Sequence, residues 1–212
     1  MFKQLSLKPS YYTSDGDSVE SFYNPVLSNA IRYQRVSGYF SAKALASYAK
    51  GLIGLAKNGG RFSLIISHDI SEEDFEAIRL GYELRREVKE DLLEKLDESL
   101  NLNEEVNYMN MAHLIAIGVV DIKIGFIKEG LFHSKFGLCE DAEGNVIYFT
   151  GSNNETYAAI NNNYEAFDIT TSWLASDFDR QKIEKAKSEF NLLWNDNAQD
   201  KNIYIKEINE VI

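Results

Sequence analysis

The stretch "LFHSKFGLCEDAEGNVIYFTGSNNETY", residues 131–157, sets two apolar runs on either side of a short polar turn. Side chains of a strand point alternately to its two faces, and residues 131–139 alternate in this way. We therefore predict a strand over residues 131–139 and a returning strand over residues 146–152. The Gly144-Asn145 pair between them predicts a two-residue hairpin turn.

Strands and helices alternate along the rest of the chain. Apolar or alternating runs predict further strands over residues 35–40, 61–67, 120–127 and 164–171, with 203–208 as a last strand or a linker. Cap residues and helical spacing predict a short helix that begins at an Asn24 cap and a longer one from a Ser41 cap to the Gly59-Gly60 stop. Three more helices are predicted over residues 71–100, 106–118 and 176–194, and a short one begins at Asn154 or Glu155. This order predicts the α/β class, an α/β sandwich in which a mixed central sheet carries helices on both faces.

Composition limits the class of protein. A chain of 212 residues suits one domain over residues 1–212, and a hydrophobic content of 44% excludes a disordered chain. The single cysteine, Cys139, excludes an internal disulfide and a Cys-rich zinc site, and it reads as a small strand residue. The N-terminus lacks the pattern of a signal peptide, and no run reaches 18 apolar residues. We expect a cytoplasmic protein that does not enter a membrane.

Charge is unevenly distributed. The net charge is −11, yet residues 1–61 carry eight Lys or Arg against three Asp or Glu, a net of +5. Residues 72–98 carry eleven acids against five bases, a net of −6, which is typical of the solvated face of a helix. An acidic protein of this kind can bind DNA through a local basic patch, with a salt-sensitive grip.

The strand pattern places His133 and Lys135 side by side, about 7 Å apart on one face. A neutral imidazole can attack phosphorus and form a covalent intermediate, while Lys135 supplies positive charge to the phosphoryl oxygens. Ser152 and Asn154 can donate further hydrogen bonds, and Glu165 can accept from the second imidazole nitrogen. This arrangement requires no metal and no cofactor.

A purely structural interpretation competes with this one. His133 can be a satisfied sheet histidine, Lys135 a surface residue and "GSNN" only a turn. The succession of "HSK", a hairpin, "GSNN" and then "NNNYE" at the start of the next strand favours the catalytic interpretation.

These motifs resemble those of the phospholipase D superfamily, whose signature is H-x-K-x4-D followed by G-S-x-N. They stand here as "HSKFGLCE" and "GSNN", and the resemblance is strongest over residues 118–171. The layout "VSGYFSAKAL…GGRFSLIIS" and the "FNLLW" helix also resemble the phospholipase D-like domains fused at the N-terminus of superfamily-2 helicases and restriction enzymes. The resemblance implies a phospholipase D-like fold. It also implies that this chain can be an excised domain, with a helicase or ATPase domain beyond residue 212.

The resemblance also assigns roles to residues. His133 matches the nucleophile, Lys135 the phosphate-binding lysine, Asn154 the asparagine of G-S-x-N, and Ser152 the hydroxyl beside it. Glu165, eleven residues further on, resembles the active-site acid of the metal-independent restriction nucleases.

Two features depart from the common pattern. Glu140 replaces the usual aspartate and is one methylene longer, so we treat it as a candidate substrate-binding residue whose contacts need adjustment. The motif also occurs only once, because neither His68 nor His113 begins a second copy, and both are interpreted as structural. Two copies normally build one site, one histidine attacking and the other protonating the leaving oxygen. The resemblance therefore implies a C2 homodimer with its site on or near the twofold axis.

The function expected from these features is a metal-independent phosphodiesterase, a nuclease acting on DNA through a phosphohistidine intermediate. Sequence-independent backbone contacts would come from basic residues of the N-terminal third, namely Arg32, Arg35, Lys43 and Arg61. The alternative is a catalytically inactive module for dimerisation or DNA binding in a helicase or restriction system. A weaker alternative is a hydrolase of phospholipids or small phosphodiesters. A G-x4-G-K-[ST] motif is absent, so NTP hydrolysis by that route is excluded.

Overall fold

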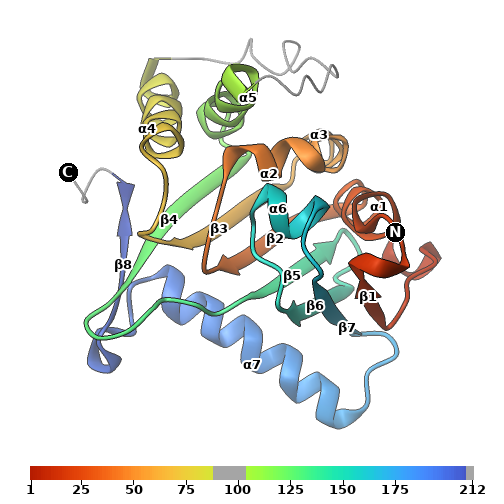
Figure 1. The fold of residues 1–212 in the computed structure, drawn as a ribbon. Helices are drawn as coiled ribbons and strands as arrows, with labels where there is room; N and C mark the ends of the chain where they lie inside the picture. The colour runs from red at the N-terminus through yellow and green to blue at the C-terminus, as the bar shows by residue number, and fades with distance from the viewer. Residues whose placement is uncertain (88–103, 209–212) are drawn as a thin grey trace.

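The computed structural model describes residues 1–87 and 104–208 of the chain. Its strands form one eight-stranded sheet in the order β1-β7-β6-β5-β2-β3-β4-β8 (Figure 1). The strands are β1 (Ser10–Tyr12), β2 (Ala30–Ser37), β3 (Arg61–Ser67), β4 (Val120–Ile127), β5 (Phe136–Asp141), β6 (Val146–Gly151), β7 (Ala166–Thr171) and β8 (Ile203–Glu207). Strands β2, β3 and β4 run parallel to one another, and every other pairing is antiparallel, so the predicted mixed sheet is confirmed.

Helices cover both faces of this sheet, as predicted. Figure 1 shows α7 alone across one face, with the remaining α-helices on the other. The helices are a π-helix (Val19–Tyr23), α1 (Asn24–Leu27), α2 (Ala42–Ser47), α3 (Ala49–Lys57), α4 (Glu72–Glu87), α5 (Glu104–Ala116), α6 (Tyr157–Asn161) and α7 (Asp177–Trp194), with short 3-10 turns at Phe2–Gln4, Thr13–Asp15 and Gln199–Lys201.

Two apolar clusters follow from the period-two alternation of the strands. The larger cluster joins α1 to α6 with inward side chains such as Tyr33 and Phe149. The smaller cluster packs the apolar stripe of α7 against the opposite face, where Val36 and Leu138 lie. The start of α7 matches the prediction, because the Ser176 hydroxyl accepts the amide of Asp179 at 3.2 Å.

Several predicted boundaries were wrong. The strand expected over 35–40 begins five residues earlier, as β2. The helix expected from Asn24 begins with the π-helix at Val19, so Asn24 lies inside it and is not a cap. The Asn24 side chain instead accepts the amide of Gly51 at 2.9 Å, a contact between helices that no local pattern predicts.

The helix predicted after Ser41 is divided in two. Tyr48 leaves the helical region with φ −120° and ψ 32°, and separates α2 from α3. The Tyr48 side chain is fully buried there and donates its hydroxyl hydrogen to Glu155, far away in the sequence. The predicted stop is confirmed, since Gly59 adopts a φ of +68°.

The hairpin of the opening stretch also differs from the prediction. Residues 131–135 are not in a strand, and β5 begins at Phe136. The turn spans residues 142–145 rather than two residues, because the Asp141 carboxylate accepts backbone amides of Glu143 and Asn145 at 3.0 and 2.9 Å. The short helix, α6, starts at Tyr157.

The other predicted elements lie where the patterns place them. Strand 61–67, strand 120–127 and the helix that ends before Gly118 are confirmed. The strand predicted over 164–171 begins at Ala166, and the tail forms β8. Of the helix predicted over 71–100, the structure describes Glu72–Glu87, and the remainder lies outside the described residues.

Candidate active site

His133 and Lys135 meet at the edge of the sheet where β2 and β6 end and β5 begins. The ammonium Nζ of Lys135 lies 3.0 Å from Nδ1 and from Nε2 of the His133 ring, and 3.0 Å from the His133 carbonyl oxygen. Because Nζ is equally far from both ring nitrogens, it lies over the imidazole ring and not in line with one nitrogen lone pair, so the contact does not fix the tautomer of His133. The pair predicted from an alternating strand therefore forms, although the residues precede the strand.

The absence of a side chain at Gly38 lets the His133 ring and the Asn154 side chain lie close to the backbone there. A Cβ atom at this position would lie 2.9 Å from Cδ2 of His133 and 3.3 Å from Oδ1 of Asn154, too close for any other residue without a shift. The ring of Tyr39 meets the imidazole edge-on, with ring centroids 5.8 Å apart. The sequence analysis missed Gly38, and its only local signal was a glycine directly after a strand.

The side chains of Asn154 and His133 both lie next to Gly38. The Oδ1 atom of Asn154 accepts the backbone amide of Tyr39 at 3.2 Å. Its Nδ2 group makes no hydrogen bond with any residue in the described part of the chain, and so it is the donor left for a bound ligand. Donation from this amide to a ligand, which the G-S-x-N motif leads us to expect, stays a prediction.

Ser152 and Glu165 form a second pair at the site. The Ser152 hydroxyl donates to Oε2 of Glu165, and Nδ2 of Asn163 donates to Oε1 at 3.3 Å. The hydrogen bond expected between Glu165 and His133 is not formed within the described residues, where the imidazole contacts Lys135 instead. The Thr150 hydroxyl donates to the Lys135 carbonyl at 2.9 Å and ties β6 to this segment.

Burial and neighbouring charges shift the pKa of Lys135 at the site. Burial lowers the pKa of its ammonium below the usual lysine value, and the positive charge of Arg35 lowers it further. The carboxylate of Glu165 opposes these effects by favouring the charged form. A lysine of this kind binds phosphate oxygens as a cation while it keeps its proton, and it loses that proton more readily than a surface lysine.

Glu140 is not brought to this cluster. It lies at the far end of β5, about 13 Å along the strand from Phe136, and it is paired with Arg32 at 3.0 Å. Its neighbour Asp141 is the buried carboxylate, with hydrogen bonds from the Asn145 side chain and the Phe2 amide. The substrate-binding role expected for Glu140 therefore has no geometric support.

The expected basic patch also needs correction. Arg35 is fully buried and paired with Glu155, so it cannot contact a DNA backbone. Arg32 and Arg61 are exposed, whereas the Lys43 ammonium lies over the Tyr157 ring, 4.4 Å from its centroid. Local sequence shows an arginine in a strand, but not the long-range carboxylate that draws it inward.

Other titratable candidates do not join the site. His68 stacks on Phe126 with ring centroids 5.3 Å apart. Cys139 is buried, and burial raises the pKa of its thiol, which disfavours the nucleophilic thiolate. Within residues 1–87 and 104–208, no three His, Cys, Asp or Glu side chains converge to hold a metal ion. None of the described helices is both long and apolar enough to cross a membrane.

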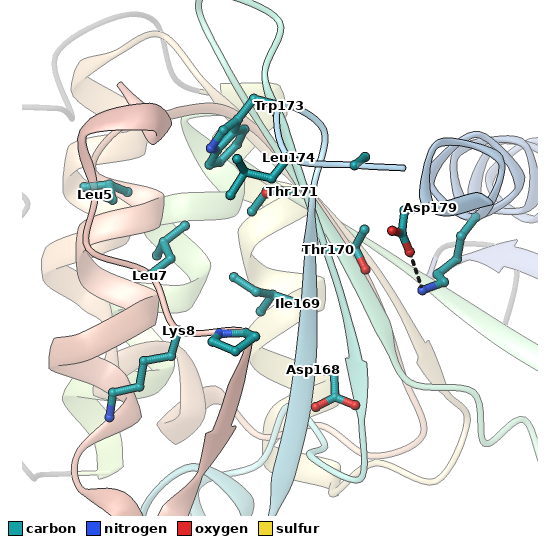
Figure 2. Close-up of a pocket in the computed structure, with 13 residues that line it drawn as sticks. Leu5, Leu7, Lys8, Asp168, Ile169, Thr170, Thr171, Trp173, Leu174 and Asp179 are labelled. Atoms are coloured by element: carbon teal, nitrogen blue, oxygen red, sulfur yellow. Dashed lines mark hydrogen bonds and ion pairs between the residues drawn. The ribbon is translucent and has the colours of Figure 1, made fainter. Parts of the chain in front are cut away.

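A cavity of about 470 Å³ lies elsewhere, beside β7 and the start of α7. Figure 2 shows Leu5 and Leu7 on one side and Trp173 and Leu174 above, with the carboxylate of Asp179 paired at the rim. None of the predicted site residues lines this cavity. The candidate site lies apart from this cavity, and its His133 and Ser152 side chains are exposed.

Comparison with known proteins gives a limited result. No protein-family model and no curated protein matches the chain. Among solved structures, NucT from Helicobacter pylori is similar at 17% identity, over 86% of this chain and 91% of that one, with a TM-score of 0.48. A phospholipase D family member, Nuc from Salmonella typhimurium, is similar at 17% identity over 86% and 92% of the two chains, with a TM-score of 0.47. Yeast tyrosyl-DNA phosphodiesterase is similar at 12% identity over 68% of this chain and 26% of its own length, with a TM-score of 0.41. At this level of similarity, the role of the site has to come from its own side chains.

Proposed function

We propose that this chain is a metal-independent phosphodiesterase that cleaves DNA through a phosphohistidine on His133. The observation that carries the proposal is the contact between the exposed imidazole of His133 and the ammonium group of Lys135, with the side-chain amide of Asn154 nearby. A nucleophile, a cation and a neutral donor are the groups that phosphoryl transfer requires.

In the proposed reaction, one ring nitrogen of His133 attacks phosphorus, and the P–O bond to the leaving group breaks. Lys135 and the amide of Asn154 stabilise negative charge on the non-bridging oxygens. The leaving oxygen takes a proton from a second imidazole. Water then attacks phosphorus and gives a proton back to the second imidazole, the P–N bond breaks, and His133 is released.

The second imidazole is assigned to another copy of the chain. The H-x-K motif occurs once in the sequence, so His133 of a twin subunit is the source that a C2 homodimer provides. The site would then lie on or near the twofold axis. Size-exclusion chromatography with light scattering measures the oligomeric state directly. A monomer that cleaves DNA would remove the dimer from the proposal.

The test of the reaction is incubation with supercoiled plasmid in excess EDTA at low salt. We expect the parent to nick the plasmid and His133→Ala to leave it intact. His113→Ala is the matched control, because it removes a histidine in the last turn of α5, just before β4 begins, at the opposite end of the parallel strands from the site. A covalent DNA adduct that survives denaturant but is lost in acid identifies the phosphohistidine. Equal cutting by His133→Ala would rule out this mechanism.

The inactive module remains the second candidate, because a specific observation favours it. Glu140 replaces the expected aspartate and pairs with Arg32 instead of approaching the site. A folded dimer that binds DNA, leaves the plasmid uncut and forms no adduct would support this alternative. A helicase or ATPase domain in the same polypeptide and a cytoplasmic location stay predictions.

A further inference from the structure

A buried ion pair includes Glu155, the residue directly after Asn154 of the candidate site. Arg35 and Glu155 are both 0% exposed, with Nε of Arg35 2.8 Å from Oε2 of Glu155. Burying two charges costs several kcal/mol in desolvation per ion, so such a pair is weak evidence for a gain in stability. Its position next to Asn154 in the sequence suggests a different role.

Both neighbours of Asn154 are held by this pair. On one side, Nη2 of Arg35 donates to the Asn153 backbone carbonyl at 2.6 Å, and the side-chain Nδ2 of Asn153 donates to the Tyr23 hydroxyl at 2.6 Å. On the other side, the carboxylate of Glu155 accepts from Arg35 and from the Tyr48 hydroxyl. The residues on both sides of Asn154 are therefore anchored by buried hydrogen bonds.

The backbone of Glu155 is fixed as well. Its amide donates to the Ser37 hydroxyl at 2.8 Å, and its carbonyl accepts the amide of Ser41 at 2.9 Å. The Ser37 hydroxyl in turn donates to the Tyr39 carbonyl at 2.7 Å. Tyr39 is the residue whose amide orients the side chain of Asn154, so the two sides of the site share one anchor.

We propose that Arg35, Glu155 and Tyr48 form a buried clamp that positions the side-chain amide of Asn154 for an incoming phosphate. None of the three touches the reacting atoms, so they are positioning residues. The clamp holds Asn154 while Oδ1 is engaged by the Tyr39 amide, which leaves Nδ2 as the donor for a phosphate oxygen. The catalytic meaning of the clamp rests on the proposed function, whereas the order that it imposes on Asn154 does not.

Two buried tyrosines make a matched pair for the test. Tyr48→Phe removes a hydroxyl that donates to Glu155. Tyr33→Phe removes a buried hydroxyl in the same core that has no hydrogen-bond partner among the described residues. Both rings are 0% exposed, so the substitutions differ in the loss of a clamp hydrogen bond and not in burial.

The first measurement is ¹⁵N relaxation of the Asn154 side-chain amide, assigned with Asn154→Asp. We expect the order parameter to fall from about 0.8 to below about 0.6 in Tyr48→Phe and to stay at the parent value in Tyr33→Phe. The second is plasmid cleavage, where we expect kcat to fall about tenfold in Tyr48→Phe, with KM within about twofold of the parent.

Each outcome decides something. A lower melting temperature in Tyr48→Phe, with amide order and kcat unchanged, would make the clamp a structural element only and overturn the proposal. If the parent cleaves no DNA, the proposed function fails, and the amide order alone decides the clamp. If Tyr48→Phe does not fold, Ser37→Ala serves instead, because it removes the anchor shared by Glu155 and Tyr39.

Discussion

Glu155 and Glu165 are ten residues apart and differ in burial, and this difference assigns the first to the stability of the fold and the second to the candidate site. Each accepts a hydrogen bond from a hydroxyl group, Glu155 from Tyr48 and Glu165 from Ser152. Glu155 is fully buried against a charged arginine, whereas Glu165 is partly exposed at the open face of the site. The buried carboxylate cannot meet a substrate, and the exposed one can.

The difference teaches that a carboxylate's role follows from what surrounds it. A buried charge without its partner is costly, so Glu155 is tied to the stability of the fold. An exposed carboxylate is solvated by water, so its loss costs little stability. Substitutions at the two positions are expected to separate folding from activity.

The largest expected effect is on the free energy of unfolding of Glu155→Ala. The change leaves Arg35 buried and unpaired, and we expect a loss of about 3–5 kcal/mol. Glu165→Ala is the matched control and should change the free energy by less than about 1 kcal/mol. Urea unfolding measures both, and equal losses would contradict the assignment of separate roles.

The next effect is on cleavage by Lys135→Met. Loss of the cation that stabilises the transition state should lower kcat/KM by about 10²–10³-fold, without loss of stability. Lys182→Met removes an exposed lysine on α7 that pairs with Asp179, and it controls for charge. Plasmid nicking rates compare the two, and unchanged cleavage by Lys135→Met would exclude Lys135 from the site.

A smaller effect separates the adjacent carboxylates Glu140 and Asp141. Asp141→Asn weakens a buried acceptor that holds the hairpin turn, and we expect a loss of about 1–3 kcal/mol. Glu140→Gln breaks an exposed ion pair with Arg32 and should cost less than about 1 kcal/mol. Thermal unfolding measures both, and a larger loss in Glu140→Gln would reverse the assignment.

Asp141 also predicts the sign of the acid response. Burial by itself would raise the pKa of its carboxyl, but hydrogen bonds from Asn145 and the Phe2 amide outweigh it and hold the pKa below its usual value. The folded state then binds fewer protons than the unfolded state. The stability that this carboxylate contributes is therefore complete above the unfolded-state pKa and is lost as pH falls through the folded-state pKa.

The smallest expected effect is a shift of the alkaline limb of activity. Burial and the charge of Arg35 lower the pKa of Lys135, so the protonated form needed for phosphate binding is lost at a lower pH than for an ordinary lysine. A pH profile of kcat/KM measures the limb, and Lys135→Arg should move it upward because a guanidinium keeps its proton. A limb that does not move would assign it to another group.

The site could be predicted in part from the sequence. Residue types and spacing alone predict five candidate residues for phosphodiester cleavage, namely His133, Lys135, Ser152, Asn154 and Glu165. Gly38 and Tyr39 were missed, since they directly follow β2, far from His133 in the sequence, and only the pairing of β2 with β5 brings them beside it. Whether the selected residues carry the reaction stays a prediction until cleavage is measured.

The sequence by itself determined most element types and the mixed α/β class, because these depend on local periodicity. His133 and Lys135 do meet, but the strand predicted to pair them begins only at Phe136. Tertiary structure alone decided where Arg35, Glu155 and Glu140 lie. Burial of a charge depends on a partner from a distant segment, and a one-dimensional pattern does not contain that information. For this reason an arginine expected to contact DNA became part of the core, and the carboxylate expected at the site lies at the far end of its strand.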